Sequence, residues 1–326
     1  MERRSGHALV MRAAVVRKPG SPLSIEARAL PRARGQEVVV RVRGAGVCHT
    51  DLELAADEER EGASVLGHEI AGEADGIGPV LVYPAWGCGR CAYCRAGDEQ
   101  LCPRSEFAGF GRDGGFAEHV LVPSRRHLFP LGGLDPVRAA VLADAGLTAY
   151  RAVRRVRSAL RDGGTAIVIG AGGLGQFALQ YLRLRTRVKS VVAVDSAPEK
   201  RARALDLGAD EALAPRRGLP AARAVLDFVG SDSTLRAGAQ ALEPGGAFVL
   251  VGAAGGTLGF GLETVPADAT FLSSISGSLG DLAAVLEHAR RGDLDWHVET
   301  LPLDRVNDAL ARLRRGDVLG RLVLTP

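Results

Sequence analysis

Four cysteines crowd into one short segment, and they constrain this chain more than any other feature. They follow the pattern Cys88-x2-Cys91-x2-Cys94-x7-Cys102. Thiolates at this spacing can wrap a single tetrahedral metal ion, and a site with four sulfur ligands leaves no open position for a substrate. The pattern therefore predicts a structural zinc that holds a loop with little apolar core of its own. An iron–sulfur cluster is the competing interpretation, because cysteine-rich runs also ligate such clusters.

The cysteine count sets these four apart from a fifth. The chain has five cysteines, and an odd number argues against a secreted disulfide framework. In a reducing compartment, clustered thiols favour metal binding over disulfides, so we expect the protein to be cytoplasmic. The fifth cysteine, Cys48, stands beside His49 and far from the cluster, which makes it a candidate ligand of a second metal site.

Length and composition are those of an ordinary globular protein with two domains. The chain has 326 residues, 46% apolar and 24% charged, and domains commonly run to about 100–200 residues. The formal net charge is only +3, and the basic residues are scattered among acidic ones, so nothing suggests nucleic-acid binding. No apolar stretch reaches the roughly 20 residues of a membrane span, so we expect no membrane insertion.

The pattern of apolar residues changes along the chain. The first half has short β-type runs broken by glycine and proline. From Thr165 onward, apolar strand-like runs alternate with helix-like segments, which is typical of an α/β domain with a doubly wound parallel sheet. The predicted strands of that sheet are 166–169, 191–194, 224–229 and 248–251, and its predicted helices are 174–184, 198–207 and 233–242.

A glycine-rich loop joins the first of these strands to the first helix and reads Gly170-Ala171-Gly172-Gly173-Leu174-Gly175. In a dinucleotide-binding fold the first glycine allows a tight turn, the second lets the backbone approach a pyrophosphate, and the third lets helix pack on strand. The free N–H groups of the helix N-terminus would bind the phosphates. Asp195 ends the next strand, where a carboxylate can accept both ribose hydroxyls and repel a 2′-phosphate. The sequence therefore favours NAD over NADP.

Cys48 has a candidate partner in His68, which stands in the segment Gly67-His68-Glu69. One thiolate and one imidazole are too few for a catalytic zinc, which takes three protein ligands and leaves the fourth position for water or substrate. The residues alone do not identify the third ligand.

Several motifs of the chain occur together in the order typical of one known family. They are Gly46-Val47-Cys48-His49-Thr50-Asp51-Leu52, Gly67-His68-Glu69, the four-cysteine segment, Ala145-Gly146-Leu147-Thr148-Ala149-Tyr150 and the loop 170–175. In this combination they resemble the medium-chain zinc-dependent alcohol dehydrogenases, in particular the bacterial NAD-linked type. The resemblance covers nearly the whole chain. It implies two zinc ions per chain and NAD as cofactors.

The resemblance also implies which residues serve the catalytic zinc. Cys48 and His68 match two of its ligands. Many members have a cysteine just before the Ala-Gly-x-Thr run as the third, and this chain has Asp144 there, which we expect to take its place. Glu69 resembles a family glutamate that can approach the metal, and Asp51 resembles the carboxylate that orients the ligand histidine.

A proton relay and a coenzyme site follow from the same resemblance. Thr50 matches the hydroxyl that takes the alcohol proton. The usual terminal histidine of the relay is replaced by Glu53, so either Glu53 or water would accept the proton. Other matching positions would contact the coenzyme: His49 and Arg321 at the pyrophosphate, Lys200 at the adenosine ribose, and Thr148 and Val251 at the nicotinamide.

The fold implied is a Rossmann doubly wound parallel sheet domain plus a mainly β, GroES-like catalytic domain with a zinc lobe. We expect the catalytic domain over residues 1–145, with its lobe at about 84–105, and the coenzyme domain over 146–280. A C-terminal segment, 281–326, would return to the catalytic domain. Relatives of this type are homodimers or homotetramers, so we expect a homo-oligomer.

Three functions are compatible with these features. The first is a zinc-dependent oxidoreductase that transfers hydride between a small-molecule alcohol or carbonyl and NAD. The second is a biosynthetic reductase of the same fold acting on carbonyls or imines, since the chemistry is reversible and the sequence does not set its direction. The third is a zinc- and nucleotide-binding protein without catalysis, which the set Cys48, Thr50, His68 and Asp144 argues against.

Overall fold

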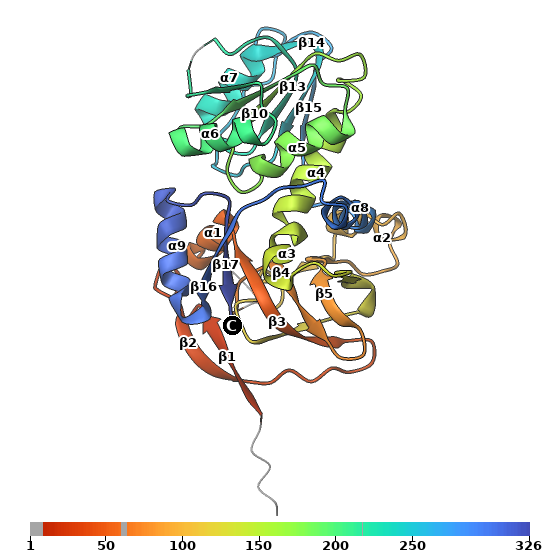
Figure 1. The fold of residues 1–326 in the computed structure, drawn as a ribbon, viewed down its shortest axis with the longest axis vertical. Coiled ribbons are helices and arrows are strands. Elements are labelled where there is room, and N and C mark those ends of the chain that lie inside the picture. Colours follow the sequence, from red (N-terminus) through yellow and green to blue (C-terminus); the bar gives the residue numbers. More distant parts are fainter. Residues whose placement is uncertain (1–8, 60–63, 217) are drawn as a thin grey trace, which may run out of the picture. The chain divides into compact units, whose positions relative to one another are not determined.

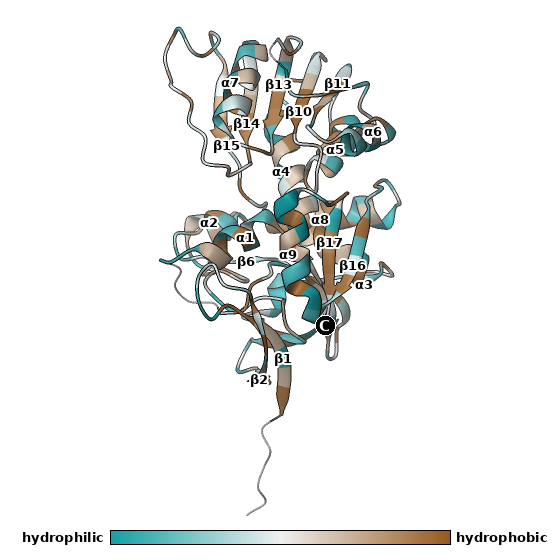
Figure 2. Ribbon diagram, turned by 90° about the vertical axis from the view of Figure 1, so that its left-hand side faces the viewer, coloured by the Kyte–Doolittle hydropathy of each residue, from teal (hydrophilic) through white to brown (hydrophobic). Residues whose placement is uncertain are grey.

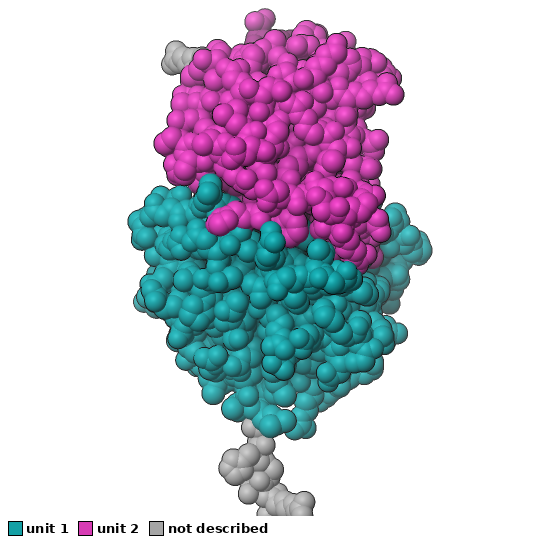
Figure 3. Space-filling model, in the orientation of Figure 1, with its two compact units in different colours: residues 1–144, 298–326 teal, residues 145–297 magenta. Residues whose placement is uncertain are grey.

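The computed structural model describes residues 9–59, 64–216 and 218–326, so part of the acidic stretch 54–64 lies outside the described residues. The chain divides into two compact units (Figure 3). Unit 1 comprises Met1–Asp144 and Val298–Pro326, and unit 2 comprises Ala145–His297. Within the described ranges, no helix has the length and apolar character needed to cross a bilayer.

Unit 2 ends at His297, later than the boundary near residue 280 that the sequence indicates. Two helices of this unit, α4 (Ala145–Val156) and α8 (Leu279–Arg290), explain the difference because they pack together. The buried carboxylate of Asp281 at the start of α8 pairs with Arg151 at 3.3 Å and Arg154 at 3.2 Å on α4.

Unit 2 is built on a six-stranded parallel sheet with the order β12-β11-β10-β13-β14-β15, which confirms the predicted doubly wound arrangement (Figure 1). The strand order reverses between β10 and β13, and ligands of such sheets bind at this switch point. Figure 2 shows these strands mostly brown, because both faces of a parallel sheet are covered. The strands are β10 (Thr165–Ile169), β11 (Ser190–Val194), β12 (Glu211–Leu213), β13 (Ala222–Asp227), β14 (Leu242–Leu250) and β15 (Thr270–Ser273).

The helices of unit 2 begin at recognisable signals. The helix α5 (Gly175–Arg185) opens at the glycine loop, and α6 (Pro198–Asp206) opens with a proline in its first turn. Ser231 caps α7 (Asp232–Ala241) by accepting a hydrogen bond from the Thr234 N–H, and Ser278 caps α8 in the same way. The two sheet-edge strands, β12 and β15, are not among the predicted strands, because each contains only two apolar residues.

Unit 1 contains a mainly antiparallel seven-stranded sheet with the order β16-β17-β3-β4-β5-β9, and β8 pairs with β3. The hairpin β1–β2 and the pair β6–β7 lie beside it. The strands are β1 (Val10–Val15), β2 (Ser24–Ala29), β3 (Val38–Val47), β4 (Glu69–Ala74), β5 (Gly78–Val82), β6 (Ala85–Trp86), β7 (Glu106–Phe107), β8 (His119–Val122), β9 (Leu128–Pro130), β16 (Val298–Pro302) and β17 (Arg321–Thr325).

Four helices lie among the described residues of unit 1, in addition to its strands. They are α1 (His49–Ala56), α2 (Ala92–Arg95), α3 (Pro136–Ala139) and α9 (Val306–Arg315). The helix α9 ends at Gly316, whose φ of 79° is the left-handed conformation typical of a glycine after a helix. It packs its apolar side into the core of this unit through Val306, Ala309, Leu310 and Leu313.

Strand register in this sheet brings three chain segments to one place. Gly46 of β3 pairs with Val323 of β17 on one side and with Glu69 of β4 on the other. A Cβ at Gly46 would lie 1.8 Å from Glu69 Oε2, so only glycine leaves room for that carboxylate. The end of β3, the start of β4 and the start of β17 therefore meet around residue 46.

Candidate active site

Cys48 follows β3 directly and is held in place by the first turn of α1. It is the N-cap of that helix, and its backbone N–H donates to Asp51 Oδ2 at 2.8 Å. The other oxygen of Asp51 accepts the Gly67 N–H at 3.2 Å. Asp51 is completely buried, so its carboxylate fixes the backbone of Cys48 and of the residue before His68 at once.

The structure brings together Cys48, His68 and Asp144. Their ligand atoms all lie within 4.8 Å of one another, and His68 Nε2 is 3.6 Å from Asp144 Oδ2. Ligands about 2.0–2.3 Å from one zinc in tetrahedral geometry would be separated by about 3.3–3.8 Å. The three residues therefore fit a zinc ion, with a fourth coordination position left over.

Charge around His68 favours a cation at this point. Burial would lower the pKa of the imidazole, but Asp51, Asp144 and Cys48 outweigh that effect and raise the pKa well above its usual value. The Nδ1 atom is 3.6 Å from Asp51 Oδ1, too long for a hydrogen bond, and it has no other partner among the described residues. A metal ion bound at Nε2 would satisfy the same anionic groups in place of the proton.

Arg321 joins the site through β17. Its side chain is 4% exposed, its Nε lies 3.1 Å from both oxygens of the fully buried Glu69, and its Nη2 also bonds Glu69. The same Nη2 is 3.5 Å from Asp144 Oδ2, the oxygen that faces His68. Burial raises the pKa of Glu69, and Arg321 only partly offsets this. The sequence suggested a pyrophosphate contact for Arg321 but gave no sign of this pairing, which depends on sheet register.

The helix α1 carries the expected relay residues. Thr50 Oγ1 lies 3.6 Å from Cys48 Sγ, next to the metal ligands. Glu53 follows one turn later on the same side of the helix, and its side chain is exposed to solvent. Neighbouring protein atoms still remove part of its hydration, and this desolvation raises the pKa of the carboxyl group. His49 is exposed at the start of the helix.

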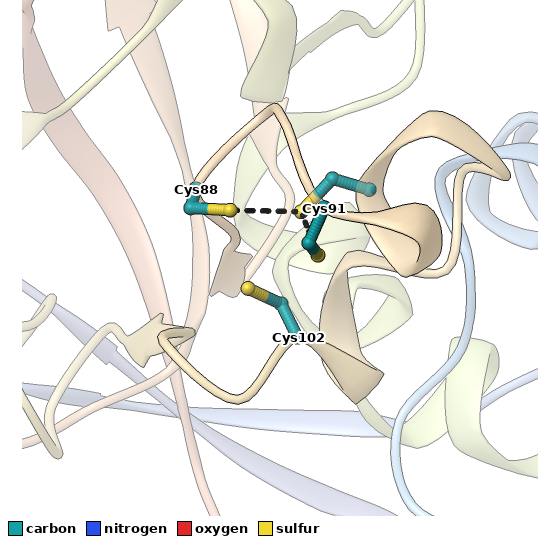
Figure 4. Close-up of side chains that lie close together, drawn as sticks. Cys88, Cys91 and Cys102 are labelled. Atoms are coloured by element: carbon teal, nitrogen blue, oxygen red, sulfur yellow. Dashed lines mark hydrogen bonds between the residues drawn. The ribbon is translucent and has the colours of Figure 1, made fainter.

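The four-cysteine lobe has the geometry of a second metal site (Figure 4). All four sulfur atoms lie within 4.8 Å of one another, with 3.5 Å between Cys91 and Cys94 and 3.9 Å between Cys88 and Cys94. Four sulfurs at about 2.3 Å from one zinc would be about 3.8 Å apart, so the cysteines fit the ion. Backbone N–H groups of Arg90 and Cys91 lower the pKa of Cys88 to about 5, whereas burial raises that of Cys94 to about 12.

The glycine loop of unit 2 shows three different reasons for glycine. Gly170 has a φ of +87°, which a side chain would strain. A Cβ on Gly172 would meet nothing within 4 Å, which leaves the backbone open to a ligand. A Cβ on Gly175 would lie 2.0 Å from Gly170 O, so close packing excludes it. These are the roles expected in a dinucleotide-binding turn.

Asp195 stands beside this loop and is fixed by two backbone N–H groups. Its Oδ2 accepts from Ala171 and its Oδ1 from Ala197, both at 2.9 Å. A cavity of about 890 Å³ opens at this edge of the sheet and is lined by Gly170, Asp195, Ser196, Arg216, Thr234 and Arg236, among others. Its size and position suit the adenosine part of a dinucleotide.

Three further expected coenzyme residues also lie in unit 2. Lys200 is half-buried on α6, Thr148 is buried on α4, and Val251 follows β14 and donates its N–H to Asp227 O. Their contacts with a coenzyme stay predictions.

Two family models match the chain. The alcohol dehydrogenase GroES-like domain matches residues 34–132, and the zinc-binding dehydrogenase model matches residues 173–291. Together they span more than half of the chain and fall on the two units.

Similar proteins cover the chain from end to end. A D-arabinose 1-dehydrogenase (NADP(+)) of Saccharolobus solfataricus is 36% identical over 97% of each chain. An NAD-dependent alcohol dehydrogenase of Sulfolobus acidocaldarius is 35% identical over 96% of this chain and 99% of its own. The crystal structure of the alcohol dehydrogenase of Aeropyrum pernix superposes with a TM-score of 0.89, at 35% identity, over 97% of this chain and 100% of that one.

The glycine loop gives a first testable prediction. Gly172→Ala should leave the melting temperature of the coenzyme-free protein unchanged or slightly higher, because the new methyl group meets nothing. It should weaken nicotinamide dinucleotide binding by about tenfold or more, since the methyl group would enter the space the pyrophosphate must approach. Calorimetric titration and thermal melts measure the two effects.

Gly175→Ala is the matched variant, because its methyl group would overlap Gly170 O. It should lower the melting temperature without any coenzyme present. Unchanged coenzyme affinity in the Gly172 variant would show that the loop does not hold the pyrophosphate.

Proposed function

The chain belongs to the medium-chain zinc-dependent alcohol dehydrogenase family, and on that premise we propose that it transfers hydride between a small-molecule alcohol and NAD. It is a zinc-dependent oxidoreductase of alcohols, because one matching family model is that of zinc-binding dehydrogenases and several relatives are named alcohol dehydrogenases. The observation that carries the proposal is the meeting of Cys48, His68 and Asp144 within 4.8 Å, with room for one further ligand.

The metal site assigns a task to each residue around it. Zinc bound there supplies Lewis acidity, which lowers the pKa of an alcohol hydroxyl or polarises a carbonyl. Cys48 and Asp144 each bring one negative charge, so with a neutral His68 they balance the charge of the ion. Arg321 Nη2 lies 3.5 Å from Asp144 Oδ2, the oxygen that faces His68, and helps to hold that carboxylate in place. Asp51 holds the backbone that carries Cys48.

Proton movement is assigned to α1. Thr50 Oγ1 lies 3.6 Å from Cys48 Sγ, where its hydroxyl can accept the proton of a substrate alcohol while it passes its own proton onward. Glu53, one turn further and exposed, can pass that proton to solvent. Partial burial raises the pKa of Glu53, which makes this carboxylate a better proton acceptor than an ordinary surface glutamate.

We propose two zinc ions per chain. The two sites share no ligand, and each has the donor set that zinc prefers: four thiolates in the lobe, and one thiolate, one imidazole and one carboxylate at the other site. Only the second leaves an open position. The lobe ion would therefore stabilise structure and the other would take part in the reaction.

Zinc analysis of Cys48→Ser tests this arrangement. The wild type should contain two zinc ions per chain and the variant one, with activity below about one-hundredth of wild type, because the remaining donors are too few for the catalytic ion. Atomic absorption on dialysed protein and an NAD-linked assay with a panel of primary, secondary and aromatic alcohols measure both.

Cys94→Ser is the matched control, since it replaces a buried cysteine of the lobe. It should also lower the zinc content, but through the other ion, and with loss of thermal stability. One zinc in the wild type that Cys48→Ser leaves in place would contradict the proposal.

We propose NAD as the preferred coenzyme. Asp195 is held by two N–H bonds at the edge of the cavity, where its carboxylate can accept ribose hydroxyls and repel a 2′-phosphate. Among relatives both preferences occur, because one is named for NADP and another for NAD. The position of Asp195 is what favours NAD in this chain.

Asp195→Ala should lower the ratio of kcat/KM for NAD to that for NADP by about a hundredfold, or about 2.7 kcal/mol of discrimination. Steady-state kinetics with both coenzymes give the ratio. Asp206→Ala removes an exposed carboxylate on α6 and should leave the ratio unchanged. Equal use of NAD and NADP by the wild type would rule out the assigned role of Asp195.

We also propose that the chain is a homodimer or homotetramer joined through unit 2. The strand β15 ends the described order of the parallel sheet, and an edge strand can pair with its copy across a two-fold axis. Large apolar side chains are exposed around it: Ile275 at 58%, Phe260 at 80% and Leu262 at 98%. Such a group of apolar residues is typical of an interface.

Ile275→Asp should shift the protein toward smaller species, because a carboxylate in an apolar interface is costly to bury. Light scattering coupled to size-exclusion chromatography measures the mass. Leu205→Asp changes a similarly exposed leucine on α6 and should leave the mass unaltered. A wild type that is monomeric at micromolar concentration would refute the proposal.

A further inference from the structure

A buried carboxylate ties the four-cysteine lobe to the rest of unit 1. Glu99 is 2% exposed and begins the short 3-10 turn Glu99–Leu101 that leads into Cys102. Its Oε2 accepts the Gly87 N–H at 2.7 Å, one residue before Cys88. A carboxylate buried to this degree is costly unless donors surround it.

Arg126 and His127 supply those donors from outside the lobe. Arg126 Nε donates to Glu99 Oε1 at 2.9 Å, and His127 Nε2 lies 3.0 Å from Oε2. Burial alone would raise the pKa of Glu99, but these two neighbours outweigh it and hold that pKa below its usual range. Both neighbours belong to the 3-10 turn Arg125–His127, which runs into β9 of the seven-stranded sheet.

The Arg126 side chain contacts the residues on both sides of Cys88, namely Gly87 and Gly89. Arg126 Nη2 donates to Gly87 O at 2.7 Å, and a Cβ on Gly89 would lie 3.1 Å from its Nη1. Together Glu99 and Arg126 bind both backbone polar groups of Gly87. A Cβ on Gly87 would lie 2.6 Å from Cys94 Sγ and 2.9 Å from Glu99 Cβ, so this backbone is wedged between the ion pair and a cysteine sulfur.

Buried aromatic side chains pack against His127, one of the two partners of Glu99. The rings of Tyr83 and His127 are stacked with 6.2 Å between their centroids, and Tyr83 Oη lies 3.2 Å from Gln100 Oε1. Trp86 donates its Nε1–H to Tyr83 O at 2.8 Å, and the centroids of the Trp86 and His127 rings are 6.5 Å apart. The lobe thus meets the sheet through a hydrogen-bonded network in which Glu99 and His127 are buried and the Arg126 side chain is 40% exposed.

We infer that Glu99 and Arg126 are positioning residues that hold the Cys88 and Cys94 sulfurs in a metal-ready arrangement, without ligating the metal themselves. Both oxygens of Glu99 are taken by donors from Gly87, Arg126 and His127, so the carboxylate acts on the site only through the backbone. The inference rests on the proposed zinc in the lobe.

Zinc release from the full-length protein tests it. With a chromogenic chelator in excess and well below the melting temperature, Glu99→Gln should speed release of the lobe ion by about tenfold and Glu99→Ala by about a hundredfold. The glutamine keeps an acceptor for Gly87 but not the charge, whereas the alanine keeps neither. The measurement is made in the wild-type and in the Cys48→Ser background. The second background should keep only the lobe ion, so it identifies which kinetic phase of zinc release belongs to the lobe.

Glu106→Gln is the matched control. Glu106 lies on β7, directly opposite Trp86, but it is 53% exposed and stands 3.8 Å from Arg112. The Glu106→Gln variant should leave the rate of zinc release from the lobe unaltered. Fluorescence gives a second readout in a Trp296→Phe background, which leaves Trp86 as the only tryptophan of the sequence. While zinc is still bound, the Trp86 emission should shift to longer wavelength in Glu99→Ala but not in Glu106→Gln, because loss of the Glu99 side chain lets water approach Trp86.

The outcomes separate the inference from the proposal beneath it. A wild type whose lobe holds no zinc overturns the lobe site and the inference together. A wild type with two zinc ions whose lobe ion leaves at the same rate in all Glu99 variants overturns the inference alone. Lower melting temperatures with unchanged release would also overturn it, because a merely structural role predicts that result.

Discussion

The buried ion pair between Arg321 and Glu69 is the interaction on which the candidate active site depends. Glu69 begins β4 and Arg321 begins β17, and β3 lies between them with Gly46 at the crossing point. Breaking a buried pair by removing one partner commonly costs about 3–5 kcal/mol. Because Cys48 follows β3 directly and His68 precedes β4, the pair fixes the strand ends from which two metal ligands extend. The third ligand, Asp144, is bound by the same guanidinium.

Electrostatics explains why such a cluster can exist in a buried place. Asp51, Glu69, Asp144 and a thiolate at Cys48 would crowd negative charge around a single fixed cation, Arg321. Without a metal, Asp51, Asp144 and Cys48 raise the pKa of His68 despite its burial, and burial raises the pKa of Glu69. A divalent ion held by Cys48, His68 and Asp144 would balance the negative charge of these groups. The donor set and its charge therefore favour a metal site at this point.

Sequence predicted best where the chemistry is local. The lobe spacing, the three glycines and the acid after the second strand all lie within short segments, and the fold class follows from alternating patterns. The third ligand Asp144 could be named only by resemblance, because no spacing links it to Cys48. The pairing of Arg321 with Glu69 depends on which strands are neighbours, and so does the role of Arg126 at Glu99. Single-residue patterns carry no information about such neighbours.

The two candidate metal sites position their ligands in different ways. The lobe takes all its ligands from one segment, so it needs a connection to the body of the unit, and Glu99 with Arg126 provides one. The other site takes its ligands from three separated segments. The sheet aligns these segments, and the ion pair between Arg321 and Glu69 holds β17 and β4 in place. In both cases an arginine–carboxylate pair outside the ligand set, with a buried carboxylate, joins ligand-bearing loops to strands of one sheet. Such pairs contribute direction more than stability, since the carboxylate geometry matches the planar guanidinium in few orientations. A metal site needs that directional control, because its ligands must reach one point within a few tenths of an ångström.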